Sequence, residues 1–138
     1  MNSNLKKLLI AFVLLVFIGA GYAYYMYNKP VESLDRKDAD VTITADQLIK
    51  DYEADENTAN QKYLGKVVIV SGKITDITTE DGKKKINLET SNPISAVICE
   101  MEENHKTEDL KAGDNVKIKG MCSGYLSDVI LVQSIIIK

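Results

Sequence analysis

Two cysteines are the residues of this chain whose chemistry is easiest to define. Cys99 and Cys122 are the only cysteines. Both share the alternation of the apolar residues around them, so both should point inward. In an exported domain they could form a disulfide worth about 3 kcal/mol, or they could pack as two buried free thiols. Nothing like Cys-x-x-Cys is present, which argues against redox catalysis.

A lysine run is the second candidate. Lys83, Lys84 and Lys85 follow one another directly. Such a run could contact an anion or a nucleic acid, or it could be a solvated hairpin that discourages aggregation. Domains that bind single strands also stack bases on aromatic side chains, and no aromatic residue flanks this run. We therefore favour the solvated hairpin.

An acidic stretch surrounds His105, the only histidine. Calcium prefers a compact loop that turns sharply at a glycine, and zinc would need more His or Cys ligands. We expect a solvated connection and no metal. The chain also lacks a Gly-rich phosphate loop and a nucleophile motif, so we expect no cofactor and no enzymatic activity. The acidic residues are Glu100, Glu102, Glu103, Glu108 and Asp109.

A membrane segment precedes these candidates. Residues 8–27 follow Lys6 and Lys7 and contain no charge and no Asn, Gln, Ser or Thr. At ~1.5 Å per residue, a helix of this length spans a ~30 Å hydrocarbon core. The segment could be a retained anchor or a cleaved signal. We favour the anchor, because the run is longer than a usual signal core and ends in tyrosines that suit the membrane interface.

The composition changes after residue 27. From Asp38 onward the chain has 18 acidic residues and 12 lysines, a net charge of −6, and no Trp or Phe. Such a domain repels phosphates unless its lysines cluster. We predict an anchor over residues 1–28, a solvated tether over 29–41 and one folded domain over 42–138. The short N-terminal tail favours a cytoplasmic N-terminus and an exported domain, although cations also follow the span.

The domain should begin with a helix and continue as strands. Thr44-Ala45-Asp46-Gln47 is typical of a capping box, which predicts a helix from about residue 45 to about 63. The apolar period then becomes two, which predicts strands at 67–74, 85–90, 95–101, 115–122 and 128–137. Gly72 suggests a bulge or a tight bend, Asp81-Gly82 suggests a hairpin turn, and the alternation places Gly120 inward and Lys119 outward. Five strands with a bent first strand predict a small closed barrel.

The order and spacing of several motifs resemble the tRNA-anti-like family of OB-fold proteins, over about residues 42–138. The motifs are the predicted helix, Gly65-Lys66-Val67-Val68, Val97-x-Cys99, Leu110-Lys111-x-Gly113-Asp114-x-Val116, Gly120-Met121-Cys122-Ser123-Gly124 and Asp128-Val129-x-Leu131. The resemblance implies a five-stranded OB-fold barrel preceded by a helix more strongly than it implies RNA binding. Many members resemble exported or membrane-anchored bacterial proteins. Members often carry a further cysteine where this chain has Ser134.

OB folds often bind ligands through the loop between the last two strands and the loop after the first. Tyr125 lies at the former and Lys83–Lys85 at the latter, so these four residues are candidate ligand contacts. Our main hypothesis is a non-enzymatic OB module on the outer face of a bacterial cytoplasmic membrane that binds a protein, peptide or glycan. The alternative is a single-stranded nucleic-acid binder, which the acidic charge and the missing aromatics disfavour.

Overall fold

A computed structural model describes residues 2–30, 32–103, 105–107 and 109–137 of the chain. Two compact units follow one another in the sequence, Met1–Glu32 and Ser33–Lys138.

The first unit is the helix α1, Ser3–Asn28. It has 26 residues and no buried side chain, and an 18-residue window within it has a mean hydropathy of 2.2. Its length and composition suffice to cross a membrane, which confirms the apolar helix predicted from residues 8–27.

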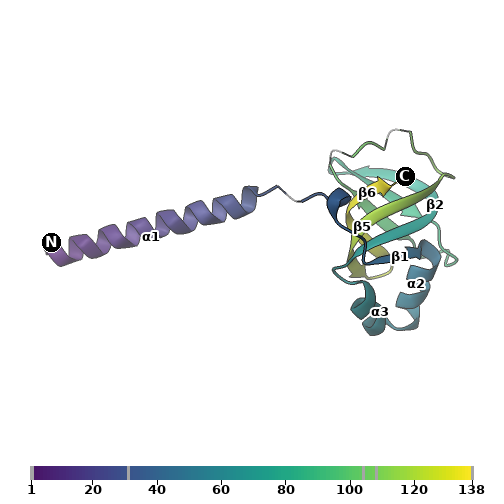
Figure 1. The fold of residues 1–138 in the computed structure, drawn as a ribbon, viewed down its shortest axis with the longest axis horizontal. Helices are drawn as coiled ribbons and strands as arrows, with labels where there is room; N and C mark the ends of the chain where they lie inside the picture. Colours follow the sequence, from purple (N-terminus) through teal and green to yellow (C-terminus); the bar gives the residue numbers. More distant parts are fainter. Residues whose placement is uncertain (1, 31, 104, 108, 138) are drawn as a thin grey trace. The chain divides into compact units, whose positions relative to one another are not determined.

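The second unit contains a closed five-stranded barrel, as predicted. Its strands are β2 (Val67–Glu80), β3 (Lys83–Leu88), β4 (Val97–Met101), β5 (Asn115–Tyr125) and β6 (Val129–Ile137). They follow the order β2-β3-β4-β6-β5, and β2 pairs with β5 to close the barrel (Figure 1). Only β4 and β6 run parallel within this ring. This is the OB-fold arrangement.

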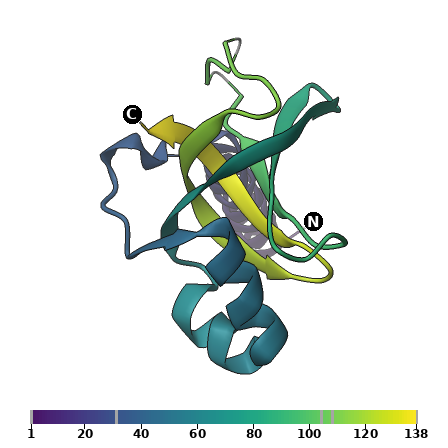
Figure 2. The same ribbon diagram turned by 90° about the vertical axis from the view of Figure 1, so that its right-hand side faces the viewer.

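The long strand β2 belongs to both halves of the barrel and curves around it (Figure 2). Residues 67–73 pair with β5, and residues 74–80 pair with β3. The register with β3 shifts between Ile74 and Asp76, so the bulge lies at Thr75 and not at Gly72, where a bulge or a tight bend was expected. Gly72 instead marks a close approach, because a β-carbon there would lie 3.2 Å from Ala45 Cβ and 3.3 Å from Leu88 Cβ.

The hairpin between β2 and β3 turns as its sequence predicts. Asp81 and Gly82 have φ angles of 51° and 76°. Two successive positive φ angles define the two-residue turn whose twist matches paired strands, and Asp-Gly is a preferred sequence for it. The turn places the three lysines at the start of β3.

The predicted single helix is two helices, α2 (Ala45–Ala54) and α3 (Glu56–Tyr63). The break is at Asp55, which is extended (φ −161°, ψ 104°) and accepts hydrogen bonds from the Asn57 and Thr58 amides. A carboxylate of this kind caps a new helix more readily than it continues an old one. Both helices lie together at one end of the barrel (Figure 1).

The start of α2 confirms half of the capping box. Thr44 Oγ1 accepts a hydrogen bond from the Gln47 amide at 3.2 Å. The Gln47 side chain, however, donates forward to Asp51 Oδ1 at 2.8 Å and does not return to the Thr44 amide. Thr44 also ends β1 (Val41–Thr44), a sixth strand that was not predicted and that pairs parallel with β2.

The segment before β1 packs on the outside of the barrel. A single turn, η1 (Leu34–Arg36), buries Leu34 completely against Val67 and Ile135 in a second apolar cluster. Ser33 Oγ donates to Glu102 Oε2 at 3.1 Å. Part of the sequence assigned to the tether therefore contributes a buried side chain to the domain.

On the same outer face, Lys119 is less exposed than its outward position in the alternation predicted. It does point away from the interior, but only 8% of it is exposed, and its neighbour across the strands is the buried Ile135. Neighbouring side chains cover the aliphatic stem of such a lysine, whereas the amine can still reach water.

Candidate ligand-binding surface

The lysine run is partly neutralised by acids on neighbouring strands. Lys85 Nζ lies 2.7 Å from Glu80 Oε2 and 3.7 Å from Glu100 Oε1. The hydrogen bond to Glu80 is the largest cause that raises the pKa of Lys85, and it also lowers the pKa of Glu80. Lys83 is exposed, and Lys84 is partly covered. Since two acids flank Lys85, the outer face of β3 and β4 offers a phosphate little net positive charge.

Tyr125 packs within the domain. Its ring stacks on Tyr52 of α2, with centroids 5.3 Å apart and an interplanar angle of 25°. The ring centroid of Tyr63 in α3 lies 6.0 Å from that of Tyr52, and the Tyr63 hydroxyl donates a hydrogen bond to Asp51 Oδ2 at 2.5 Å. Burial and this hydrogen bond raise the pKa of Tyr63 to about 12. Tyr125 thus helps to hold the two helices on the barrel, a role with no local sequence signal.

The four expected ligand contacts do not form one site. Tyr125 ends β5 beside the beginning of β2, where Met121 is the register partner of Val67. Lys83 pairs with Glu80 at the other end of β2. The full length of a 14-residue strand separates the two positions along the barrel wall.

The two cysteines are free and buried, so the disulfide that the sequence allowed is not formed. Burial raises the pKa of the Cys99 thiol. Cys122 Sγ lies 3.5 Å from Tyr52 Oη. Both thiols therefore serve as small apolar side chains of the core.

The acidic stretch is held both to the segment before β1 and to β6. Glu102 accepts from Ser33, and His105 Nε2 accepts a hydrogen bond from the Ile136 amide of β6 at 2.8 Å. Glu108 lies outside the described residues. Within the described ranges, no three His, Cys, Asp or Glu side chains are grouped so that they could hold a metal ion.

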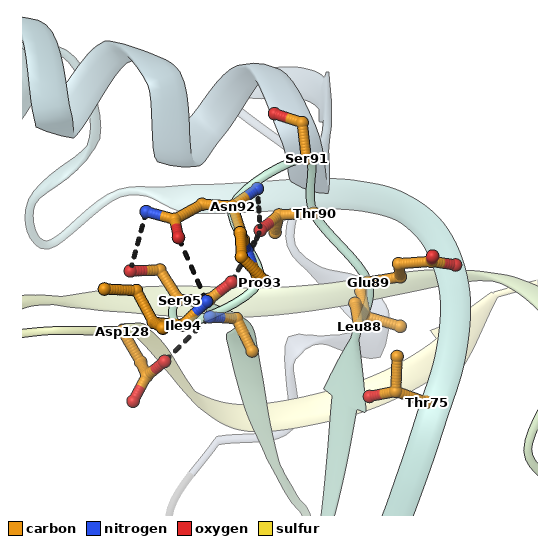
Figure 3. Close-up of a pocket in the computed structure, with 11 residues that line it drawn as sticks. Thr75, Leu88, Glu89, Thr90, Ser91, Asn92, Pro93, Ile94, Ser95 and Asp128 are labelled. Atoms are coloured by element: carbon orange, nitrogen blue, oxygen red, sulfur yellow. Dashed lines mark hydrogen bonds between the residues drawn. The ribbon is translucent and has the colours of Figure 1, made fainter.

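Two hollows in the domain adjoin each other, and the sequence predicted neither of them. The first, here called the loop hollow, has a volume of about 670 Å³ (Figure 3). It lies beneath the connection from β3 to β4, and Ile94 on its wall is 84% exposed. Its lining residues are Thr75, Leu88, Glu89, Thr90, Ser91, Asn92, Pro93, Ile94, Ser95, Ala96 and Asp128.

Three acidic side chains fix the walls of the loop hollow. Asp128 Oδ1 accepts from the Ala96 amide at 2.7 Å, which ties the β5–β6 loop to β4 (Figure 3). Asp46 Oδ1 accepts from the Ser91 amide at 2.7 Å, and the Asn92 side-chain amide donates to Glu53. The β3–β4 connection is therefore held both to the barrel and to α2.

The second, here called the strand hollow, has a volume of about 760 Å³. Glu89 lines both hollows, so the two adjoin at this residue. Aliphatic side chains from four separate segments contribute to its wall, and local sequence gives no sign of such a surface. Its lining residues are Thr44, Ala45, Asp46, Ser71, Gly72, Glu89, Leu110, Asn115, Val116, Lys117, Ile136 and Ile137.

The combined lining is acidic and aliphatic. Asp46, Glu89 and Asp128 contribute carboxylates, and Lys117 is the one basic side chain among these lining residues. Hydrogen bonds from Lys50 and Ser91 lower the pKa of Asp46 to about 2, so it remains charged at neutral pH. The lining residues include no His, Cys or aromatic side chain. Such a surface is suited to holding a ligand by charge and apolar contact.

The fold and these hollows define a protein with an OB-fold domain that follows an apolar N-terminal helix. The chain belongs to the tRNA_anti-like family, whose model matches residues 1–136. A search of the curated proteins found no match.

Solved structures with similar folds include a "putative nucleic acid-binding lipoprotein" from Klebsiella pneumoniae. It is 20% identical, has a TM-score of 0.57, and the match covers 69% of this chain and 91% of that one. Yeast Stn1 and Ten1 give 13% identity, a TM-score of 0.44, and 77% and 66% coverage. An OBody bound to hen egg-white lysozyme is 17% identical and has a TM-score of 0.40. That match covers 54% of this chain and 84% of the OBody chain. At 20% identity, the likeness to the Klebsiella structure shows the fold alone.

Proposed function

We propose that this protein is a non-enzymatic binding module that α1 holds at the outer face of a bacterial cytoplasmic membrane. Its OB-fold domain binds a protein or peptide partner. The proposal rests chiefly on the two adjoining hollows, whose lining is acidic and aliphatic and includes no His or Cys side chain. Protein interaction sites commonly combine apolar contact with complementary charge.

The second candidate function is single-stranded nucleic-acid binding. It is supported by the name of the Klebsiella structure and by the position of Lys83, Lys84 and Lys85 beside the β2–β3 hairpin. Two observations weigh against it. Glu80 and Glu100 flank Lys85, and the partly buried Tyr125 already stacks on Tyr52 of α2. Single-strand binding uses aromatic platforms and a positive groove.

The orientation in the membrane is supported by Lys6 and Lys7, which lie in the first turns of α1, before its uncharged run. The Klebsiella structure is named a lipoprotein, which agrees with an envelope protein of related fold. A C-terminal alkaline phosphatase fusion tests this part. We expect an active fusion in the membrane fraction, whereas an inactive one would place the domain in the cytoplasm.

Binding of nucleic acid is tested with the full chain in phosphatidylcholine nanodiscs. We would titrate a labelled oligothymidylate and an oligouridylate of about 15 nucleotides and measure fluorescence anisotropy. We expect no binding near physiological salt, about 0.15 M. Micromolar binding that weakens with salt and with Lys83→Glu would favour the second candidate.

A further inference from the structure

We propose that the adjoining hollows bind a flexible polypeptide segment in which a basic residue lies between aliphatic residues. The basic side chain contacts Glu89, and the aliphatic ones enter the hollows on either side. This inference rests on the proposed function and adds the location and the chemistry of the ligand.

Charge is the first reason for a basic ligand. Glu89 stands where the two hollows adjoin, Asp128 lines the loop hollow and Asp46 lines the strand hollow. The lining of the loop hollow includes no lysine or arginine. Lys73 Nζ approaches Glu89 Oε2 only to 4.0 Å, and both side chains are more than half exposed. A pair of this kind is weak in water, so a ligand cation can replace Lys73 with little loss.

Apolar surface is the second reason. Ile94 is 84% exposed, although a side chain of this size usually gains about 1.5–3 kcal/mol from burial. Leu110, Val116 and Ile136, which are only partly buried, contribute aliphatic surface to the strand hollow. An aliphatic residue on each side of the ligand cation would cover both surfaces. The lining lacks aromatic side chains, so a nucleic acid would find no base-stacking platform there.

Gly72 contributes to the depth of the strand hollow. Its hypothetical β-carbon would press on Ala45 and Leu88, so glycine lets the strand, the helix start and the end of β3 approach one another. The hollow's walls are therefore fixed by backbone packing, which lowers the entropy lost when a ligand binds.

The test is selection of a random peptide phage library on the full chain in phosphatidylcholine nanodiscs, after depletion on empty nanodiscs. Selected peptides are synthesised, and their Kd is measured by fluorescence anisotropy. We expect them to contain a lysine or arginine flanked by Leu, Ile or Val. Glu89→Lys and Ile94→Ser should each weaken binding about tenfold.

Two matched variants serve as controls. Glu103→Lys makes the same charge change at an exposed acid outside both hollows, and Leu64→Ser removes another exposed aliphatic side chain outside them. Both controls should leave the Kd within about twofold. All four substitutions lie at exposed positions, and equal melting temperatures will show that the fold is intact.

The outcomes separate this inference from the proposed function. Peptides that bind equally well to Glu89→Lys and to the controls, or that lack a basic residue, overturn the inference and leave a peptide-binding module. Failure to select any peptide, or tighter binding of an oligothymidylate or a chitotetraose than of the selected peptides, overturns both. Tenfold losses confined to Glu89→Lys and Ile94→Ser support both.

Discussion

Gly120 of β5 faces Ser134 of β6 so closely that a β-carbon on Gly120 would lie 2.6 Å from Ser134 Oγ and 3.0 Å from Leu131 Cβ. The cause is a bulge in β6. Met121 pairs with Val132 and Lys119 with Ile135, so Gly120 faces both Gln133 and Ser134. Gln133 has a φ of 53°, as one residue of such a bulge often does. The bulge thus requires glycine on the opposite strand.

Gly120→Val should lower the free energy of unfolding by ~1–3 kcal/mol or more, because the added atoms overlap Ser134 and Leu131. The measurement is the denaturant midpoint. Lys119 is too covered to serve as the neutral comparison, so the control is Lys117→Ala at an exposed position on the same strand.

Ser134→Gly should recover part of the stability lost through Gly120→Ala, because it removes the hydroxyl that the new β-carbon would meet. Additive effects of the two substitutions would contradict this account of the bulge.

Removal of Leu34 should weaken the domain as a core substitution does. Leu34 is 0% exposed, so Leu34→Ala should cost about 2–5 kcal/mol. A chain beginning at Asp38 should lose a similar amount relative to one beginning at Glu32, because Val67 and Ile135 become uncovered. Melting curves of the two chains decide it. Identical curves would show that residues 29–41 are only a spacer.

Cys99 and Cys122 should both remain free in the purified protein. Cys99 of β4 pairs with Leu131 on one side of β6, and Cys122 of β5 pairs with Leu131 on the other side, so β6 lies between the two cysteines. Two strand spacings of ~4.8 Å place their α-carbons roughly 9 Å apart, beyond the ~7 Å that a disulfide spans. Cells would be lysed in iodoacetamide, and peptide masses would count the alkylated cysteines in the unreduced, unfolded chain. Alkylation only after reduction would mean that the pair is bridged.

Asp46 should make stability depend on pH in the acid range. Its pKa is about 2 when folded, against 3.8 for the free side chain, because Lys50 and Ser91 donate to its carboxylate. A lowered folded pKa contributes stability above pH ~4 that is lost as the pH falls towards about 2. Asp46→Asn should therefore be less stable than the parent chain at pH 5, and the difference should shrink towards pH 2. A difference that is constant across this range would contradict the assignment.

Several features were visible in short stretches of sequence because their causes are local. The uncharged run after Lys7 predicted α1, and Asp81-Gly82 predicted the hairpin. Period-two apolar patterns predicted all five barrel strands, and Thr44 predicted the start of α2. The break at Asp55 was missed because the apolar spacing continues across it, whereas the Asp55 side chain caps a new helix there.

Composition, residue period and turn chemistry act over a few residues, so the amino-acid sequence alone was enough to predict the apolar helix, the barrel and its acidic charge. The folded structure was needed to show that Leu131 separates the cysteines, that Leu34 belongs to the domain, that Tyr125 stacks on Tyr52 and that Glu89 joins two hollows. Each of these depends on strand register and on contacts between distant segments. Register is fixed by how the whole barrel closes, and no local pattern encodes it.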